Sequence, residues 1–274
     1  SKPLTLFTSS LSKEEKITIE SKTNDLTLST PSQTILFKGY APNDFPPFPL
    51  VKELYRITFK KTELSKALLK SIVAASRNTI KPELASIYFL LEGGVITVAA
   101  TDSFRLSEEQ LKPSLSSIKE TREHILLPLK AAEEIIKIIE YPDGDAVEFL
   151  VGKGEMCVIY GETQCYSRLT EGVFPEYKQI IPEQFATYAT ISRHALLGHI
   201  RRASIFANKL NGISLSLSSG ERHCRLESSN RDVGEYRATL ATDVKGTDVN
   251  VFFNYRYLLD GLESFSDDQL FFGL

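Results

Sequence analysis

The strongest constraint on the fold of this chain is that its sequence repeats. Short amphipathic helical segments begin near residues 2, 129 and 254, and each is followed by a turn-rich or acidic link and a strand, which gives a period of roughly 126 residues. A second series is offset from the first. Residues 57–77 and 189–209 each combine a strand, a cap and a longer helix, and each is followed by a hairpin. The chain is therefore predicted to repeat one β-rich module with two helices, without the front of the first copy and the end of the third.

The spacing of apolar residues predicts helices over residues 3–10, 62–77, 129–140, 192–208 and 255–265. Thr62 and Ser192 have side chains suited to N-caps, and Asn208 fits the end of a helix. Short apolar or alternating runs between turn residues predict strands in most of the remaining chain. The pattern thus favours an α+β fold dominated by strands.

Two proline-containing segments mark boundaries between the modules. Residues 40–51, YAPNDFPPFPLV, carry four prolines and favour an extended connection. Residues 172–184, GVFPEYKQIIPEQ, form the second boundary. The predicted domains are therefore 1–51, the second half of one module, 52–182, a complete module, and 183–274, a module without its last strands.

The composition excludes several classes of protein. With 42% apolar and 24% charged residues, the chain has the composition of an ordinary soluble globular protein. No apolar run approaches the ~18 residues that span a bilayer, and no secretory leader opens the chain, so we expect a soluble cytoplasmic protein. The three cysteines lack a C-x-x-C pair, which favours free thiols. Because the chain begins with Ser1 and its only methionine is Met156, we expect a piece of a longer gene product.

The sequence offers no convincing catalytic or metal site. His194 and His199 are five positions apart, which does not place two imidazoles on one side of a helix, and no metal or cofactor is predicted. The segment ATDSFRL, residues 101–106 with the alanine before them, brings Asp102 near Arg105, but acid–base catalysis needs a second convergent group. An Asx turn with an ion pair is the favoured interpretation, and an enzyme using residues 101–105 stays the alternative. Catalysis would leave Phe104 without a role.

Two of the predicted helices separate apolar from cationic residues. In the helix over 62–77 the apolar face contains Leu64, Leu68, Ile72 and Ala75, and in the helix over 192–208 it contains Leu196, Leu197, Ile200, Ala203 and Ala207. The cations expected on the opposite, outward side are Lys66, Lys70, Arg77 and the nearby Lys81 in one copy, and His194, Arg201 and Arg202 in the other. A solvated helix face is the alternative, but the same segregation in both copies of a chain with net charge −3 favours a surface that faces phosphates.

Three motifs together resemble one family. ATDSFRL is similar to A-T-D-G-H-R-L, EGVFPEYKQIIP to a (D/E)-G-x-F-P-x-Y motif, and VFFNYRYLLDGLESF to an N-x-x-Y-(L/V)-L-D motif of the bacterial sliding clamp, the beta subunit of DNA polymerase III. Their order, their spacing and the repeat also match, over essentially the whole chain. The resemblance implies the clamp fold, with helices on an inner face and antiparallel sheets outside, in a chain truncated at both ends.

The resemblance also implies a function. Family members are replication processivity factors without catalysis, in which a head-to-tail homodimer forms a ring around double-stranded DNA. The implied partners are DNA, bound without regard to sequence, the replicative polymerase, the clamp loader and other proteins with a clamp-binding motif, and no membrane. A DNA- or peptide-binding β-protein that never closes into a ring remains the alternative function.

Partners of this family insert a short peptide related to Q-L-x-L-F into an apolar groove. Carried over position by position, the resemblance assigns to the groove Leu84, Thr101, Ser103, Phe104, Arg105, Leu106, Pro175, Gln179, Ile180, Asn254 and Tyr257. Ser103, Phe104 and Gln179 stand where Gly, His and often Arg are usual, so the groove should be more apolar at 104 and less positive at 179.

The end of the sequence raises two further expectations about the groove. The family tail Met-Pro-x-Arg-Leu does not occur in it, and weaker peptide binding is expected. The last residues, QLFFGL at 269–274, are themselves similar to a groove-binding peptide. We expect them to form a strand of the last module, with insertion into the groove of a neighbouring molecule as the alternative.

Overall fold

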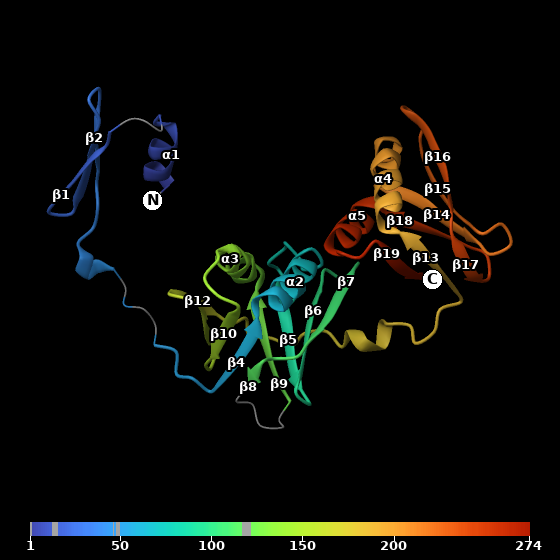
Figure 1. Cartoon of the computed structure of the whole chain (residues 1–274), viewed down its shortest axis with the longest axis horizontal. Helices are drawn as coiled ribbons and strands as arrows, with labels where there is room; N and C mark the ends of the chain where they lie inside the picture. The colour runs from blue at the N-terminus through green and yellow to red at the C-terminus, as the bar shows by residue number, and fades with distance from the viewer. Residues whose placement is uncertain (1, 13–15, 46, 48–49, 117–121) are drawn as a thin grey trace. The chain divides into compact units, whose positions relative to one another are not determined.

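The computed structural model describes residues 2–12, 16–45, 47, 50–116 and 122–274. The chain folds as two compact units, Ser1–Leu50 and Val51–Leu274. The boundary between them falls in the predicted proline-rich connection, of which residues 46, 48 and 49 lie outside the described residues. Figure 1 labels the elements of both units, which are described separately below.

The first unit is small. It contains α1 (Lys2–Ser10), β1 (Thr18–Lys22), β2 (Asp25–Ser29), β3 (Thr34–Phe37) and a 3-10 turn, η1 (Pro42–Asp44). The strands form one antiparallel sheet in the order β1-β2-β3. Among the described side chains of this unit only Leu28 is buried, and the rings of Phe7 and Phe37 lie 6.4 Å apart.

The second unit begins with a complete module. Its helices are α2 (Lys61–Ile72) and α3 (Leu129–Glu140), and its strands are β4 (Tyr55–Lys60), β5 (Ser86–Glu92), β6 (Val95–Thr101), β7 (Leu106–Leu111), β8 (Leu115–Ser116), β9 (Glu123–Pro128), β10 (Ala146–Val151), β11 (Glu155–Tyr160) and β12 (Thr163–Arg168). They form two antiparallel sheets, in the orders β12-β11-β10-β4-β8 and β7-β6-β5-β9. We call this part the middle module.

A segment with one 3-10 turn, η2 (Tyr177–Ile180), leads to the C-terminal module. Its elements are β13 (Thr187–Ser192), α4 (Arg193–Ala203), η3 (Ser204–Phe206), β14 (Gly212–Ser218), β15 (His223–Asn230), β16 (Gly234–Ala241), β17 (Asp243–Gly246), β18 (Val249–Asn254), α5 (Tyr255–Ser264) and β19 (Gln269–Gly273). The two sheets have the orders β17-β13-β19 and β16-β15-β14-β18.

The strand orders confirm the repeat. The order β16-β15-β14-β18 in the C-terminal module matches β7-β6-β5-β9 in the middle module, and β17-β13-β19 matches β8-β4-β10. In the first unit, α1 is followed by β1-β2-β3 as α3 is followed by β10-β11-β12. The predicted offset series also holds, because the first helix of each of these two modules, α2 or α4, comes directly after the strand β4 or β13.

Each module has its own apolar core. In the middle module the rings of Phe59 and Phe149 are 4.9 Å apart and those of Phe89 and Phe149 are 5.9 Å apart, at the centre of a cluster that includes buried residues of both helices and both sheets. α3 contributes Leu129, Ala132, Ile135, Ile136 and Ile139, the spacing of one helix face. A separate cluster fills the C-terminal module.

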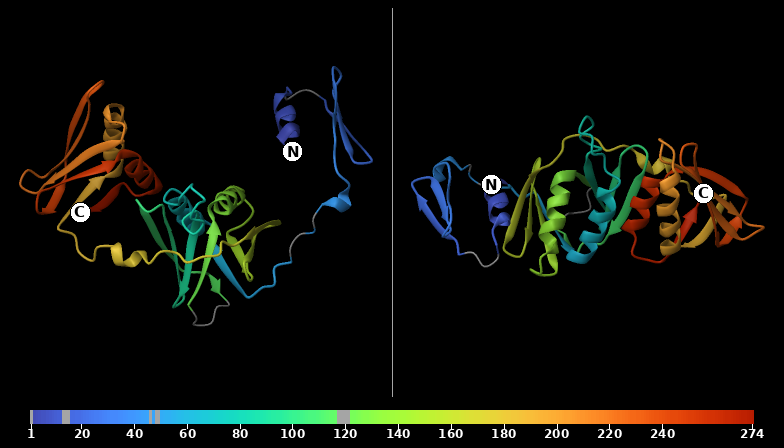
Figure 2. Two further views of the ribbon diagram at one scale, coloured as in Figure 1. Left: turned by 180° about the vertical axis from the view of Figure 1, so that it is seen from behind. Right: turned by 90° about the horizontal axis from the view of Figure 1, so that it is seen from above.

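The helices of the second unit form one continuous layer. α2 contacts α3, α5 contacts α4, and α2 contacts α5 across the boundary between the modules. From above, α3, α2, α5 and α4 follow one another in a row (Figure 2, right). Among the described residues no helix is long and apolar enough to cross a membrane.

Several sequence predictions need correction at their edges. α2 ends at Ile72 rather than near residue 77, and the amide of Ser76 donates its hydrogen bond to Leu84 O instead of continuing the helical pattern. Its N-cap is Lys60, so the prediction for Thr62 was wrong. Ser192 does cap α4, and its Oγ accepts a hydrogen bond from the Ala195 amide at 3.3 Å. α4 ends at Ala203 and continues only as η3.

The segment QLFFG is a strand of its own sheet. β19 pairs antiparallel with β13, with Ile191 opposite Leu270 and Ala189 opposite Phe272. The Leu274 amide also donates a hydrogen bond to Thr187 O. The expected strand is confirmed, and the alternative that this segment enters a groove of a neighbouring molecule was wrong.

The aromatic centre of the middle module should dominate its stability. We expect Phe149→Ala to reduce the free energy of unfolding by about 3 to 5 kcal/mol, because it leaves a cavity between Phe59 and Phe89. Phe252→Ala, at a ring that is 77% exposed on β18, should change it by less than about 0.5 kcal/mol. Urea denaturation measures both variants, and equal losses would contradict the assignment of the core.

Candidate functional site

The loop between β6 and β7 is closed by its own side chains. Thr101 Oγ1 donates to Arg105 O at 2.7 Å and accepts from the Ser103 amide at 3.1 Å. Asp102 Oδ1 accepts from the amides of Phe104 and Arg105 at 2.9 and 3.0 Å. The predicted Asx turn is therefore present. Ser103 has a φ of 78°, in the left-handed region that favours glycine, the residue usual at this position in the resembling motif.

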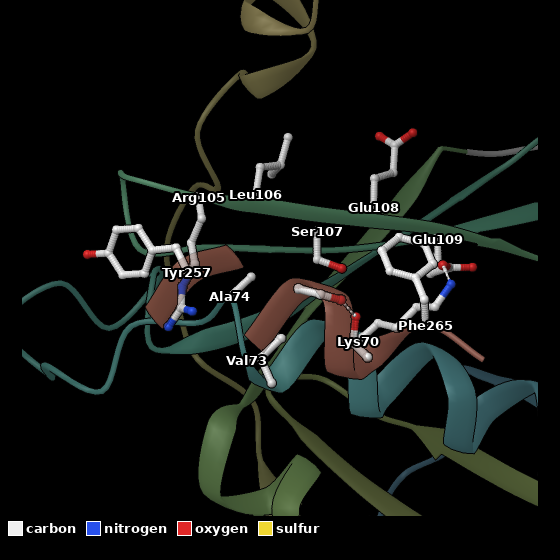
Figure 3. A pocket seen from close by; sticks show the side chains of 12 residues that line it. Lys70, Val73, Ala74, Arg105, Leu106, Ser107, Glu108, Glu109, Tyr257 and Phe265 are labelled. Atoms are coloured by element: carbon white, nitrogen blue, oxygen red, sulfur yellow. Dashed lines mark hydrogen bonds and ion pairs between the residues drawn. The ribbon is translucent and has the colours of Figure 1, made fainter. Parts of the chain in front are cut away.

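Arg105 joins this loop to the C-terminal module. Its Nε donates to Asp102 Oδ2 at 3.0 Å, and its Nη1 donates to Asp260 Oδ2 on α5. The guanidinium carbon lies 4.6 Å from the centre of the Tyr257 ring, within the range of a cation–π contact (Figure 3). Burial lowers the pKa of Arg105, but the hydrogen bonds to Asp260 and Asp102 outweigh it and leave the pKa raised. The side chain is thus a charged link between the modules.

Phe104 presents an apolar surface beside this link. Its side chain is 80% exposed, and its ring lies 6.4 Å from that of Tyr257 at an interplanar angle of 28°. Exposed aromatic residues in contact with one another are frequent at sites that bind proteins. The ion pairs of Asp102 and Arg105 account for both charges without a reacting group. The cluster has the geometry of a binding surface.

A cavity of about 300 Å³ lies between the modules next to Arg105 and Tyr257 (Figure 3). α2, β7 and the C-terminal half of α5 supply most of its walls. Its lining residues are Lys70, Val73, Ala74, Arg105, Leu106, Ser107, Glu108, Glu109, Tyr257, Gly261, Ser264 and Phe265. The cavity shares Arg105, Leu106 and Tyr257 with the predicted groove.

Lys70 lies in this cavity and does not face outward. Its side chain is 8% exposed, forms an ion pair with Glu109 on β7, and places Nζ 4.6 Å from the centre of the Phe265 ring. The prediction that Lys70 faces DNA was therefore wrong. The reason is that the side of α2 directed away from its own apolar core is partly covered by β7 and by the residue that follows α5, which the helix pattern alone does not reveal.

The segment between the modules is anchored by two aromatic residues. The ring of Phe174 stacks on Tyr88 at 4.6 Å with an interplanar angle of 2°, and it packs edge-on against Tyr177 at 5.9 Å. Tyr177 Oη donates to Glu108 Oε2 on β7. Burial raises the pKa of the Tyr177 hydroxyl, and the bond to Glu108 raises it further. Sequence reasoning did not select these anchors, although both lie inside the quoted motif.

The structure brings part of the predicted groove together. Phe104 and Arg105 share one surface with Tyr257, whereas the side chain of Leu106 points away from Tyr257 (Figure 3) and packs against the cluster that contains Phe174 and Tyr177. Among the other predicted residues, Leu84 is buried, and Asn254 caps α5 by accepting from the Arg256 amide at 3.0 Å. Exposed positions near η2 are Pro175, Gln179 and Ile180. That these residues belong to the same groove stays a prediction.

The predicted cationic positions, apart from Lys70, are at least partly exposed. They are Lys66, Arg77 and Lys81 in the middle module and His194, Arg201 and Arg202 in the C-terminal module. Some of their charge is balanced within the chain: Arg77 pairs with Glu133 on α3 at 3.3 Å, and Arg201 pairs with Glu263 on α5 at 2.8 Å.

His199 on α4 belongs to a polar network and not to a metal site. Its Nδ1 lies 2.8 Å from Tyr236 Oη and 3.2 Å from Arg202 Nη2, and Arg202 Nε donates to Tyr236 Oη at 3.1 Å. Burial lowers the pKa of His199 below its ordinary 6.5, and the charge of Arg202 lowers it further. A neutral imidazole that accepts at Nδ1 fits these donors.

No group of three or more metal-ligating side chains occurs among the described residues. Cys157, Cys165 and Cys224 carry free thiols, as predicted. Burial raises the pKa of Cys224 to about 12, so this thiol is unreactive at neutral pH.

Two family models match the chain. The central domain of the DNA polymerase III beta subunit matches residues 58–176, and the C-terminal domain of that subunit matches residues 178–274. The chain belongs to the bacterial sliding clamp family. Membership identifies it as part of a non-enzymatic processivity clamp of DNA replication, which removes the enzymatic alternative for residues 101–105.

Individual relatives agree with this assignment. The beta sliding clamp of Synechococcus elongatus is 25% identical over 264 residues, covering 96% of this chain and 70% of that protein. The beta sliding clamp of Staphylococcus aureus is 26% identical over 263 residues, covering 91% and 69%. The match to the Synechocystis clamp covers 65% of that protein.

Solved structures confirm the clamp fold. The DNA polymerase III beta subunit of Pseudomonas aeruginosa aligns with a TM-score of 0.85 at 23% identity, covering all of this chain and 74% of that one. A sliding clamp of the same organism bound to griselimycin aligns with a TM-score of 0.87 at 22% identity, covering all of this chain and 73% of that one.

The lowered pKa of His199 predicts a pH dependence of stability. As the pH falls through 6.5, the unfolded chain binds a proton that the folded network resists, so the free energy of unfolding should decrease toward lower pH. Between about pH 7.5 and about pH 5.5, His199→Gln should lose less stability than the unmodified chain. Urea denaturation at both pH values tests this, with His194→Gln, at an exposed position of the same helix, as the control. An equal loss in the His199 variant would contradict the prediction.

Proposed function

We propose that this chain is the greater part of a clamp subunit that encircles double-stranded DNA as a homodimer and tethers partner proteins through a peptide-binding groove. The observation that carries the proposal is the layer formed by helices α3, α2, α5 and α4. Exposed cations lie on α2 and just after it in the middle module, and on α4 in the C-terminal module. The helix layer of the repeated modules can then contact successive phosphates of the DNA backbone, which also repeats.

The charges support weak contacts with DNA that do not depend on sequence. Lysine and arginine contacts to phosphates position a protein but do not read bases. The ion pairs of Arg77 and Arg201 and the net charge of −3 oppose tight electrostatic binding. Such a surface suits a protein that must slide, provided that a closed ring keeps it on the DNA.

The surface formed by Phe104, Arg105 and Tyr257 supports the peptide groove. It offers two aromatic rings and a guanidinium held by two carboxylates at the junction of two modules. A peptide with apolar side chains, related to Q-L-x-L-F, can bury those side chains against the rings. The replicative polymerase, the clamp loader and other carriers of such a motif are the proposed partners, in the cytoplasm and away from membranes.

Retention on circular DNA distinguishes a ring from an open DNA-binding protein. We expect the full-length protein, once loaded, to remain on closed circular DNA at a salt concentration that removes electrostatic binders, and to be lost after the circle is cut. Gel filtration of loaded, labelled protein measures both states. Equal loss from closed and cut DNA would contradict ring closure and support the open alternative.

The same assay tests the cationic layer. Charge reversal by Lys66→Glu, Arg201→Glu and Arg202→Glu should reduce loading several-fold, since each adds repulsion to phosphate. The matched control is Lys245→Glu on β17, an exposed cation of a sheet. Unchanged loading of the triple variant would remove these residues from the DNA interface.

A further inference from the structure

Arg105 is held between carboxylates of two modules. Asp102 belongs to its own loop, whereas Asp260 is on α5 of the C-terminal module. The Arg105 side chain is 24% exposed, and that of Asp260 is 42% exposed. Asp260 lies three residues after Tyr257 on α5, and residues at this spacing share one side of a helix. The same guanidinium therefore contacts Asp260. It also lies next to the ring of Tyr257, as Figure 3 shows.

We propose that Asp260 is a positioning residue of the peptide groove, which acts by holding Arg105 on Tyr257. The proposal rests on the groove function proposed above and adds Asp260, which lies in the quoted family motif but is not among the predicted groove residues. An arginine side chain has many rotamers, and a second carboxylate acceptor restricts it to those in which it lies over the ring. Tyr257 is thereby fixed opposite Phe104, at a ring separation of 6.4 Å.

If Asp260 had a purely structural role, its loss would mainly lower the free energy of unfolding. Ion pairs that are partly exposed contribute little to the free energy of unfolding. Asp102 also still binds the Arg105 Nε when Asp260 is removed, and the cores of the two modules do not include Asp260. The loss of this carboxylate should therefore change the groove more than the folding equilibrium.

The test measures binding of a labelled Q-L-x-L-F peptide to the 274-residue chain by fluorescence anisotropy. Asp260→Asn, which keeps the shape of the side chain but removes its charge, should weaken binding about tenfold. Asp260→Glu should recover part of the affinity. The matched control is Glu263→Gln on the same helix, where the carboxylate pairs with Arg201 of its own module, and it should leave peptide affinity unchanged.

A double-mutant cycle separates positioning from a general loss of structure. In a Tyr257→Leu background, Asp260→Asn should have almost no further effect, because the ring that Arg105 holds is gone. An unchanged affinity of Asp260→Asn, or an equal loss in both backgrounds, would overturn the proposal. Failure of the unmodified chain to prefer this peptide over a scrambled one would instead reject the groove itself, so the two failures are distinguishable.

Discussion

The contact of Arg105 with α5 is the interaction on which the candidate site depends. The middle module supplies Phe104 and Arg105 from a loop closed by Thr101 and Asp102, and the C-terminal module supplies Tyr257 and Asp260 from one side of a helix. Neither module has the surface alone. A second contact between the modules, from the Lys70 ammonium to the Phe265 ring, lies at the other end of the same cavity. Both junction contacts combine a cation with an aromatic ring, which keeps the charge close to apolar surface.

The repeat explains why one layer of helices spans both modules. Each module carries two helices across its sheets, and α2 and α5 meet where the modules join. The sheets on their far side have matching strand orders. Exposed basic residues lie on α2 and shortly after it in the middle module, and on α4 in the C-terminal module, so cationic positions repeat along the layer. Internal ion pairs reduce its strength, as suits a scaffold that must move along its partner.

Much of the fold could be predicted from sequence, but less of the site. The helix over 129–140 was predicted with its observed bounds, because its apolar residues all pack on the core of its own module. The strand Thr163–Arg168 is polar and at most half-buried, so its sequence pattern gives little signal, and its place is set by pairing with β11. The burial of Lys70 depends on β7 and Phe265, which lie far from it in the sequence. Phe104 and Tyr257 came from the family resemblance, whereas Asp260 is the last residue of the quoted N-x-x-Y-(L/V)-L-D motif and was not assigned to the groove, although it shares one side of α5 with Tyr257.

The most direct measurement is a crystal structure of the chain with a bound Q-L-x-L-F peptide. The account predicts that the apolar side chains of the peptide lie against Phe104 and Tyr257, with Arg105 between Asp102 and Asp260. A structure in which Phe104 and Tyr257 lie far apart, or in which the peptide occupies another surface, would contradict it.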